Sequence, residues 1–301
     1  MSRHVVSKHS QREESKKMYL LYHRKSAPTG RIIASALGIP HGFGFAEDEA
    51  MREIPISGSL IRWGSRGYWQ THSTRNRVIN SSQAIGNASH KLASLELMAN
   101  AGVSIPAFST NPQDLLEKFG WPLLGRRISH AKGSDIILCL QDRDLRRERD
   151  FYTVYIPVKR EYRFHVAFGE VIRVQAKYLD NAAESVSFIR NHRYGYRFRA
   201  PRRRPNTERF NTAIAAINAH GLDFGAVDLI VGDDGKSYVL EVNTAPSCSP
   251  LTARAYVDAF ANHLGIALQE KNLNYLKLLS DNEESADEEF EDDNLDREEN
   301  L

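Results

Sequence analysis

The stretch GLDFGAVDLIVGDDGKSYVLEVNTAP, residues 221–246, carries most of what the sequence says about the fold. Ala226–Val231 and Lys236–Asn243 are short runs rich in apolar and β-branched residues, and the GDDG tetrapeptide at 232–235 between them is a strong turn signal. We therefore predict an antiparallel β-hairpin with a two-residue loop at the two aspartates.

Side chains alternate along a strand, so this hairpin has two faces. A two-residue loop places Asp228 opposite Val239 and makes Glu241 its diagonal neighbour. The predicted core face carries Val227, Leu229, Val231, Tyr238, Leu240 and Val242. The predicted polar face carries Asp228, Ile230, Val239, Glu241 and Asn243. A shift of one residue would bury the carboxylates, so the apolar face determines the register.

Three oxygen-bearing side chains gather on the polar face, namely Asp228, Glu241 and Asn243. Two neighbouring carboxylates repel each other, and a bound cation relieves that repulsion. Carboxylate and amide oxygens without a nearby Cys or His pair suit Mg²⁺ or Mn²⁺, and Mg²⁺ commonly completes its shell with substrate phosphates. The sequence therefore predicts a metal site here, with a solvated acidic hairpin face as the alternative.

The AVDLIV and YVLEVNTAP stretches resemble the C-terminal signature of the ATP-grasp carboxylate–amine ligases. More narrowly, they resemble the branch that contains glutamate ligases of the ribosomal-protein-modifying type and related phage-encoded proteins. The resemblance covers residues 80–265 well and residues 17–80 loosely. It implies that Asp228, Glu241 and Asn243 hold the Mg²⁺ ions that bridge the ATP phosphates. The implied fold is α+β, with an N-terminal α/β lobe, a small glycine-loop lobe and a larger antiparallel lobe that holds the metal hairpin.

The nucleotide-binding residues come from the smaller lobe. Trp121–Leu124 and Ile136–Leu140 are predicted strands, and the Gly- and Ser-bearing loop between them suits phosphate binding through backbone N–H groups, although most such loops are plain hairpins. The resemblance places the phosphate-contacting Lys of the family at Arg126, an exchange that keeps the charge and changes the geometry. It also places the loop glycine at Gly133. The remaining nucleotide contacts it implies lie in the adenine-binding connection near 154–158, at Tyr155 and Ile156.

Tyr162–Phe168 and Ile172–Tyr178 form a second predicted hairpin. A three-residue loop at 169–171 aligns the apolar residues on one face. That face then carries Tyr162, Phe164, Val166, Phe168, Ile172, Val174, Ala176 and Tyr178. On the other face Arg163 lies opposite Lys177, and like charges in that position destabilise a hairpin unless an anion lies between them.

We expect triphosphate or an acidic substrate between these two cations, with both side chains splayed into water as the alternative. The Glu-x-Arg pattern of Glu161 and Arg163 also resembles the family, in which the Arg contacts substrate or phosphate. The arginine-rich YRFRAPRRR run at 196–204 suits phosphates or an acidic acceptor. Arginines interleaved with Tyr and Phe also suit RNA, which is the competing interpretation.

The sequence also predicts a helix before the small lobe's strands and a division of the chain into lobes. Ser81 or Ser82 caps a predicted helix that runs to Asn100 and is closed by Gly102. Its apolar positions, Ile85, Ala88, Leu92, Leu95 and Ala99, recur at helical spacing. The predicted organisation is a flexible arm at 1–16, an N-terminal α/β lobe at 17–80, a small lobe at 81–158, a large lobe at 159–270 and an acidic disordered tail at 271–301.

Composition narrows the class of protein. The chain has 301 residues, of which 41% are hydrophobic and 26% charged, which is typical of a globular protein. Two cysteines argue against a disulfide framework and favour a reducing cytoplasm, and neither a membrane span nor a signal peptide is expected. The net charge of +2 combines −11 from residues 281–301 with +13 from the preceding 280 residues, so the body attracts anions. We favour a tail that only aids solubility, with folding back over the basic cleft as the alternative.

We expect ATP-dependent carboxylate–amine ligation through an acyl phosphate, with ATP and Mg²⁺ or Mn²⁺ as cofactors. Arg126, Arg163 and Lys177 would neutralise charge on the transferred phosphoryl group, and Arg190 would orient the acyl phosphate. The partners are a small-molecule or peptide carboxylate and an amine. Two alternatives stay open: a nucleotide-binding protein without turnover, favoured by the Arg at 126, and a nucleic-acid-binding protein that uses the basic body.

Overall fold

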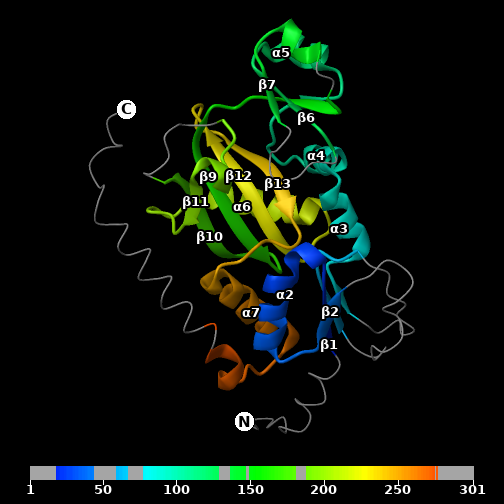
Figure 1. The fold of residues 1–301 in the computed structure, drawn as a ribbon, viewed down its shortest axis with the longest axis vertical. Coiled ribbons are helices and arrows are strands. Elements are labelled where there is room, and N and C mark those ends of the chain that lie inside the picture. The colour runs from blue at the N-terminus through cyan, green and yellow to red at the C-terminus, as the bar shows by residue number, and fades with distance from the viewer. Residues whose placement is uncertain are drawn as a thin grey trace.

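The computed structural model describes residues 18–43, 59–66, 77–128, 136–146, 149–180, 188–274 and 276. Three sheets follow one another along the long axis of the molecule (Figure 1). The predictions for the arm at 1–16, for Gly133 and for the acidic residues 281–301 lie outside the described residues. Among the described residues, no helix is both long and apolar enough to cross a membrane.

The first sheet is parallel and has the strand order β2-β1-β3-β4. Its strands are β1 (Met18–Tyr22), β2 (His41–Phe43), β3 (Ser59–Trp63) and β4 (Val78–Ile79). Two helices, α2 (Ala27–Leu37) and α7 (Pro250–Leu264), pack on each other and share its core. Residues 270–274 are helical and Leu276 is buried in the same core, so folded chain extends past residue 271, where the tail was predicted to begin.

The smallest sheet is antiparallel and has the strand order β5-β8-β6-β7. Its elements are β5 (Phe108–Ser109), α5 (Pro112–Phe119), β6 (Leu123–Arg126), β7 (Ile137–Cys139), the 3₁₀ helix η3 (Asp142–Arg146) and β8 (Phe151–Val154). Arg126 pairs with Phe151 and so ends a strand, whereas the sequence placed it in the loop that follows. Figure 1 shows this lobe at the end of the molecule opposite α7.

The single helix predicted up to Asn100 is two helices, α3 (Ser82–Ser89) and α4 (Lys91–Asn100). The hydroxyl of Ser81 caps α3 by accepting a hydrogen bond from the backbone N–H of Ala84, as one of the two predicted caps. His90 leaves the helical conformation, with φ −93° and ψ 103°. Its Nδ1 accepts a hydrogen bond from the N–H of Ala93, so a side-chain cap satisfies a donor that the break exposes. Apolar spacing continues across the break, which is why periodicity alone missed it.

The central sheet is antiparallel and has the strand order β11-β10-β9-β12-β13. Its strands are β9 (Val158–Ala167), β10 (Glu170–Leu179), β11 (Tyr196–Arg199), β12 (Phe224–Gly232) and β13 (Ser237–Asn243). The short 3₁₀ helices are η1 (Arg24–Ser26) and η4 (His192–Tyr194). Helix α6 (Thr207–Ala219), capped by Asn206, packs on one face together with α3 and α4. On the opposite face α7 covers the end where Ala167 and Phe224 lie, and polar side chains occupy the part that α7 leaves open.

The register between β12 and β13 differs from the predicted one. Asp228 lies directly opposite Glu241, not opposite Val239, which faces Leu229. The register shifts between these two pairs, leaving Leu240 without a partner as a β-bulge. The loop has three residues, ends in Gly235 at φ +76°, and is closed by the N–H of Gly232 bonding to the carbonyl of Lys236. Val239 therefore joins the core, while Tyr238 and Leu240 are only half-buried.

The hairpin of β9 and β10 is also closed differently. The loop has two residues, Phe168 and Gly169, and both have positive φ. A register shift between Val171 and Arg173 then realigns the strands. The apolar residues still share a face over most of the hairpin, but a bulge aligns them and not the predicted three-residue loop.

Candidate nucleotide and metal site

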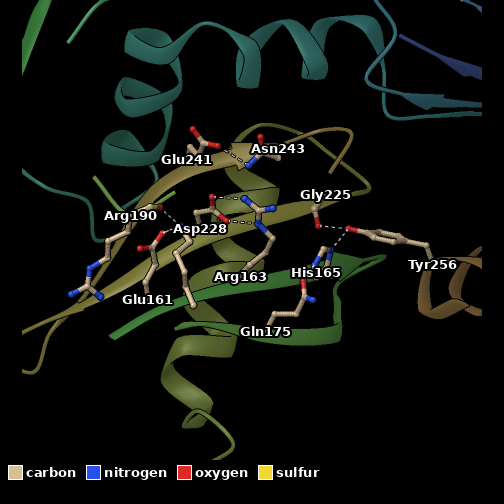
Figure 2. A network of polar contacts seen from close by, with 11 residues as sticks. Glu161, Arg163, His165, Gln175, Arg190, Gly225, Asp228, Glu241, Asn243 and Tyr256 are labelled. Carbon is tan, nitrogen blue, oxygen red and sulfur yellow. Dashed lines mark hydrogen bonds and ion pairs between the residues drawn. The ribbon is translucent and has the colours of Figure 1, made fainter. Parts of the chain in front are cut away.

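A row of charged side chains crosses the open face of the central sheet, one from each of three neighbouring strands. Glu241 on β13 faces Asp228 on β12, and Asp228 in turn faces Arg163 on β9. Figure 2 shows these groups together with Asn243 on the same side of the sheet. The alternation of β12 brings this row about, because Val227 and Leu229 on either side of Asp228 are fully buried against the core under α6.

Arg163 and Asp228 form a bidentate ion pair. Nε of Arg163 donates to Oδ1 of Asp228 at 2.6 Å, and Nη2 donates to Oδ2 at 2.7 Å. Burial alone would raise the pKa of Asp228, but the guanidinium beside it lowers that pKa below its usual value. Burial likewise opposes the charge on Arg163, and the carboxylate more than offsets it, so the pKa of Arg163 is raised. Both groups are therefore held in their charged forms.

A second ion pair lies beside the first, between Lys177 on β10 and the buried Glu161 on β9. Burial raises the pKa of Glu161, although Lys177 acts in the opposite direction. Phe198 on β11 pairs with Lys177, and its ring centre lies 4.9 Å from Lys177 Nζ and 4.4 Å from Arg163 Cζ. One aromatic ring thus contacts both cations.

The prediction that Arg163 lies directly opposite Lys177 across the hairpin is wrong. Arg163 lies opposite Gln175, because the two-residue loop and the bulge set a different register. Each cation is neutralised by a carboxylate of the chain itself, so no external anion is needed to stabilise the hairpin. The sequence prediction failed because it considered one hairpin alone, whereas the partner of Arg163 comes from the neighbouring strand β12.

The three predicted metal ligands lie together and fit a hard cation. Asn243 donates from its Nδ2 to Oε1 of Glu241 at 2.8 Å, and Glu241 is exposed. Asp228 and Glu241 supply carboxylate oxygens and Asn243 an amide oxygen, which are donors that Mg²⁺ accepts. Among the described residues, no group of three His, Cys, Asp and Glu side chains gathers into a metal site, so an amide and substrate oxygens would have to complete the shell.

Two further cations approach Glu241 from elsewhere. Arg126 lies at the end of β6, and its Nε is buried without a hydrogen-bond partner within the described part of the chain. Burial lowers the pKa of Arg126, and Glu241 opposes that effect. Burial also lowers the pKa of Lys91, the first residue of α4. Glu241 opposes that effect, and the nearby charge of Arg126 adds to it. An unsatisfied buried donor beside an acidic site fits a phosphate oxygen.

Lys91 was not among the residues predicted from the sequence. It lies 150 residues before Glu241 along the chain, and the packing of α4 beside β13 brings the two together. A Lys in the first turn of a helix interacts unfavourably with the helix dipole. This unfavourable position is the local sequence signal that could have pointed to Lys91.

The other predicted contacts are placed as follows. Tyr155 and Ile156 lie between β8 and β9, half-buried, where the chain passes from the small sheet to the central one. Arg190 bonds through Nη2 to the carbonyl of Val158 at 2.6 Å, and its guanidinium points away from the pair of Asp228 and Arg163 (Figure 2). The position of Arg190 therefore does not support direct contact with an acyl phosphate at that pair.

A neutral hydrogen-bond network borders the site on the side of α7. His165 is fully buried, with Nδ1 3.1 Å from the hydroxyl of Tyr256 and Nε2 3.1 Å from Oε1 of Gln175. Tyr256 donates its hydroxyl to the carbonyl of Gly225 at 2.9 Å (Figure 2). Burial lowers the pKa of His165 to about 3, so its imidazole is neutral and serves structure rather than proton transfer.

Comparison with known proteins bears on the fold of the chain. No family model matches the chain. A curated relative, described as a probable alpha-L-glutamate ligase from Shewanella denitrificans, is 23% identical over 236 residues, covering 74% of this chain and 78% of its own length.

Several solved structures share the fold. D-alanine–D-alanine ligase from Bacillus anthracis, complexed with ATP, is 18% identical with a TM-score of 0.60, covering 87% of this chain and 98% of that one. The ATP-grasp ligase PsnB, complexed with a minimal precursor, is 15% identical with a TM-score of 0.58, covering 83% of this chain and 98% of that one. N5-carboxyaminoimidazole synthetase from Staphylococcus aureus is 14% identical with a TM-score of 0.60, and the match covers 84% of this chain and 78% of that one. The chain therefore has the ATP-grasp fold, and the resemblance to ATP-grasp ligases predicted from its C-terminal hairpin is confirmed.

Proposed function

We propose that this chain is an ATP-dependent carboxylate–amine ligase that forms an amide bond through an acyl phosphate and releases ADP and phosphate. The observation that carries the proposal is the row of Glu241, Asp228 and Arg163 on three adjacent strands of an ATP-grasp sheet. Two facing carboxylates suit a metal, and the adjacent guanidinium suits an anion. The curated relative and the solved ligases with this fold support the same reaction class.

The residues have separate roles in this proposal. Asp228, Glu241 and Asn243 hold Mg²⁺, which when bound neutralises phosphate charge. Lys91 and Arg126 bind phosphate oxygens, with the unsatisfied Nε of Arg126 as a ready donor. The backbone of 155–157, between the two sheets, binds the adenine.

Charge that develops on the transferred phosphoryl group is stabilised by Arg163 and Lys177. Both now bind carboxylates of the chain, so each has to exchange its partner for the substrate. The carboxylate substrate attacks the γ-phosphorus of ATP and ADP leaves; the amine then attacks the acyl carbon and phosphate leaves. The cations on the open face favour an acidic amino acid or an acidic peptide as the carboxylate. The two free cysteines, Cys139 and Cys248, support a cytoplasmic location.

The test is incubation with Mg²⁺–ATP and pooled amino acids, with ADP release measured and products identified by mass spectrometry. Asp228→Asn and Glu241→Gln should each reduce ADP release by at least about a hundredfold. Asp258→Asn removes a carboxylate from an exposed pair with Arg254 on α7 and should leave it unchanged. Equal ADP release in all four proteins would contradict the proposal. Steeply salt-dependent RNA or DNA binding without ADP release would favour the nucleic-acid alternative.

A further inference from the structure

A cavity of about 260 Å³ lies at the edge of β10, on the side of the central sheet that α6 covers. Its lining residues are Val171, Ile172, Arg173, Val174, Pro201, Arg204, Pro205 and Phe210. The ring of Phe210 also packs against Phe164, whose side chain points away from the face that carries Arg163. The cavity is therefore separate from the candidate nucleotide site. This cavity is open to solvent on one side, and its volume exceeds the roughly 150 Å³ of an enclosed cavity that holds benzene, so an aromatic ring fits in it from outside.

The cavity adjoins an open strand edge. β11 pairs with β10 only over residues 176–179. Within the described part of the chain, no strand pairs with the outer edge of β10 over residues 170–172, on the N-terminal side of Arg173. An edge of this kind accepts an extended segment through backbone hydrogen bonds, with alternate side chains seated in neighbouring pockets.

Two arginines, Arg173 and Arg204, form a basic rim of the cavity, and the chain segment that supplies Arg204 is strongly basic. Residues 188–207 contain no Asp or Glu and seven arginines: Arg190, Arg193, Arg197, Arg199, Arg202, Arg203 and Arg204. Arg204 lines the cavity with its Cζ 5.1 Å from the ring centre of Phe210, and Arg202 lies 5.5 Å from that of Tyr178. The surface thus fits an extended segment with an aromatic anchor flanked by acidic residues.

We propose that residues 288–292 of this same chain, EEFED, bind this surface, with Phe290 in the cavity. Phe290 is the one aromatic residue in 277–301, and acids flank it directly on both sides. Its carboxylate neighbours meet the arginines of the rim while the ring enters the apolar part of the cavity. This assignment is independent of the ligase activity and adds an intramolecular docking surface to the fold.

The segment is long enough to reach the cavity. Leu276, the last described residue, is buried in the core cluster against which Ile172 packs, and Ile172 also lines the cavity. Phe290 follows 14 residues later, and an extended chain covers about 3.3 Å per residue, or roughly 45 Å in all. Attachment to the same chain raises the effective concentration of the segment, so modest contacts suffice. The charges of −11 in residues 281–301 and +13 in the rest of the chain add long-range attraction.

Hydrogen exchange of the backbone amides of residues 170–172 in the full-length chain tests the proposal. Phe290→Ser should speed their exchange by about tenfold, because the bound segment protects them. Leu295→Ser, in the same acidic stretch, is the matched control and should leave the rate unchanged. At about 0.5 M salt the wild-type rate should approach that of the Phe290→Ser variant, because screening weakens the charge attraction.

A charge exchange gives a second measurement. Arg204→Glu should speed exchange in the same amides, and Glu289→Arg added to it should restore protection. Equal rates in the wild type and Phe290→Ser would overturn the proposal, since either no segment or an external partner would then cover the edge. If Phe290→Ser and Leu295→Ser lost the same amount of amide protection, Phe290 would not be the residue that anchors the segment. Protection that increases with protein concentration would assign the segment to a second copy and overturn docking within one chain.

Discussion

The guanidinium of Arg163 and the carboxylate of Asp228 are joined by two hydrogen bonds of 2.6 and 2.7 Å, so Arg163 occupies both oxygens of a proposed metal ligand. A metal ion and Arg163 therefore compete for Asp228. Metal binding would release Arg163 towards an anionic substrate, and this links assembly of the metal site to the availability of the cation that the proposed reaction needs.

Breaking the ion pair of Arg163 and Asp228 should destabilise the folded protein. Arg163→Gln leaves Asp228 buried without its countercharge and should lower the free energy of unfolding by about 3 kcal/mol. Adding Asp228→Asn should restore most of that loss, because the orphaned charge is removed. Urea unfolding of the two single variants and the double variant measures this. A double variant whose loss equals the sum of the single losses would contradict the pairing.

The same competition predicts tighter metal binding in the absence of nucleotide. Arg163→Gln should increase the affinity for Mn²⁺ by at least about tenfold, because about 1.4 kcal/mol of competition for Asp228 is removed. Electron paramagnetic resonance of free Mn²⁺ measures it. Arg209→Gln is the control, since its guanidinium contacts Tyr162 on the α6 side. Weaker Mn²⁺ binding in Arg163→Gln than in the wild type would show that Arg163 does not obstruct the ligand.

His165 should make the protein sensitive to acid. Its pKa is about 3 in the folded protein, against the ordinary histidine value of 6.5 that holds in the unfolded chain. Below pH 6.5 the unfolded state therefore takes up a proton that the folded state does not, and stability falls progressively between pH 6.5 and about 3. Between about pH 7 and 5 this residue should account for about 2 kcal/mol of lost unfolding free energy. His165→Asn should remove that part of the pH dependence, as measured by urea unfolding at several pH values. If the unfolding free energy of the variant changed with pH as steeply as that of the wild type, His165 would not be the cause.

Gly225 should matter because of its neighbour Asn243. A Cβ built at Gly225 would lie 2.9 Å from the backbone oxygen of Asn243 and 2.9 Å from Cδ1 of Ile217. Gly225→Ala should therefore displace β13, cost about 1–3 kcal/mol and weaken Mg²⁺–ATP binding, measured by calorimetry. Gly86→Ala is the contrast, because its nearest atoms are 3.6 Å away on Arg66 and it lies in a helix, where Ala is favoured. Equal effects of the two substitutions would contradict the close approach.

Lys91 should bind phosphate together with Arg126. Lys91→Met should weaken ADP binding by about tenfold, or about 1.4 kcal/mol, because one charge-assisted hydrogen bond is lost. Lys118→Met on α5 removes an exposed Lys that contacts Phe119 and should leave affinity unchanged. Calorimetric titration with ADP distinguishes the two, and equal affinities in all three proteins would exclude Lys91 from the site.

Local chemistry made several elements predictable from the sequence. Ser81 and Asn206 cap their helices, and Gly265 ends α7 in the left-handed conformation, because each depends on a few adjacent residues. The polar position of Asp228 was predictable for a similar reason, since Val227 and Leu229 on either side of it alternate into the core. The break at His90 was missed because a side-chain cap competes with helix propagation and leaves no mark in apolar spacing.

The sequence by itself determined the hairpin of β12 and β13, its burial of one apolar face and the carboxylates that it presents on the other. Only the tertiary structure decided which residues those carboxylates meet. Leu240 bulges out and brings Glu241 opposite Asp228, β9 supplies Arg163, and α4 carries Lys91 to the same place. The physical reason is that alternation and capping are energies of neighbouring residues, whereas register and ion pairing depend on contacts between strands and helices far apart in the chain.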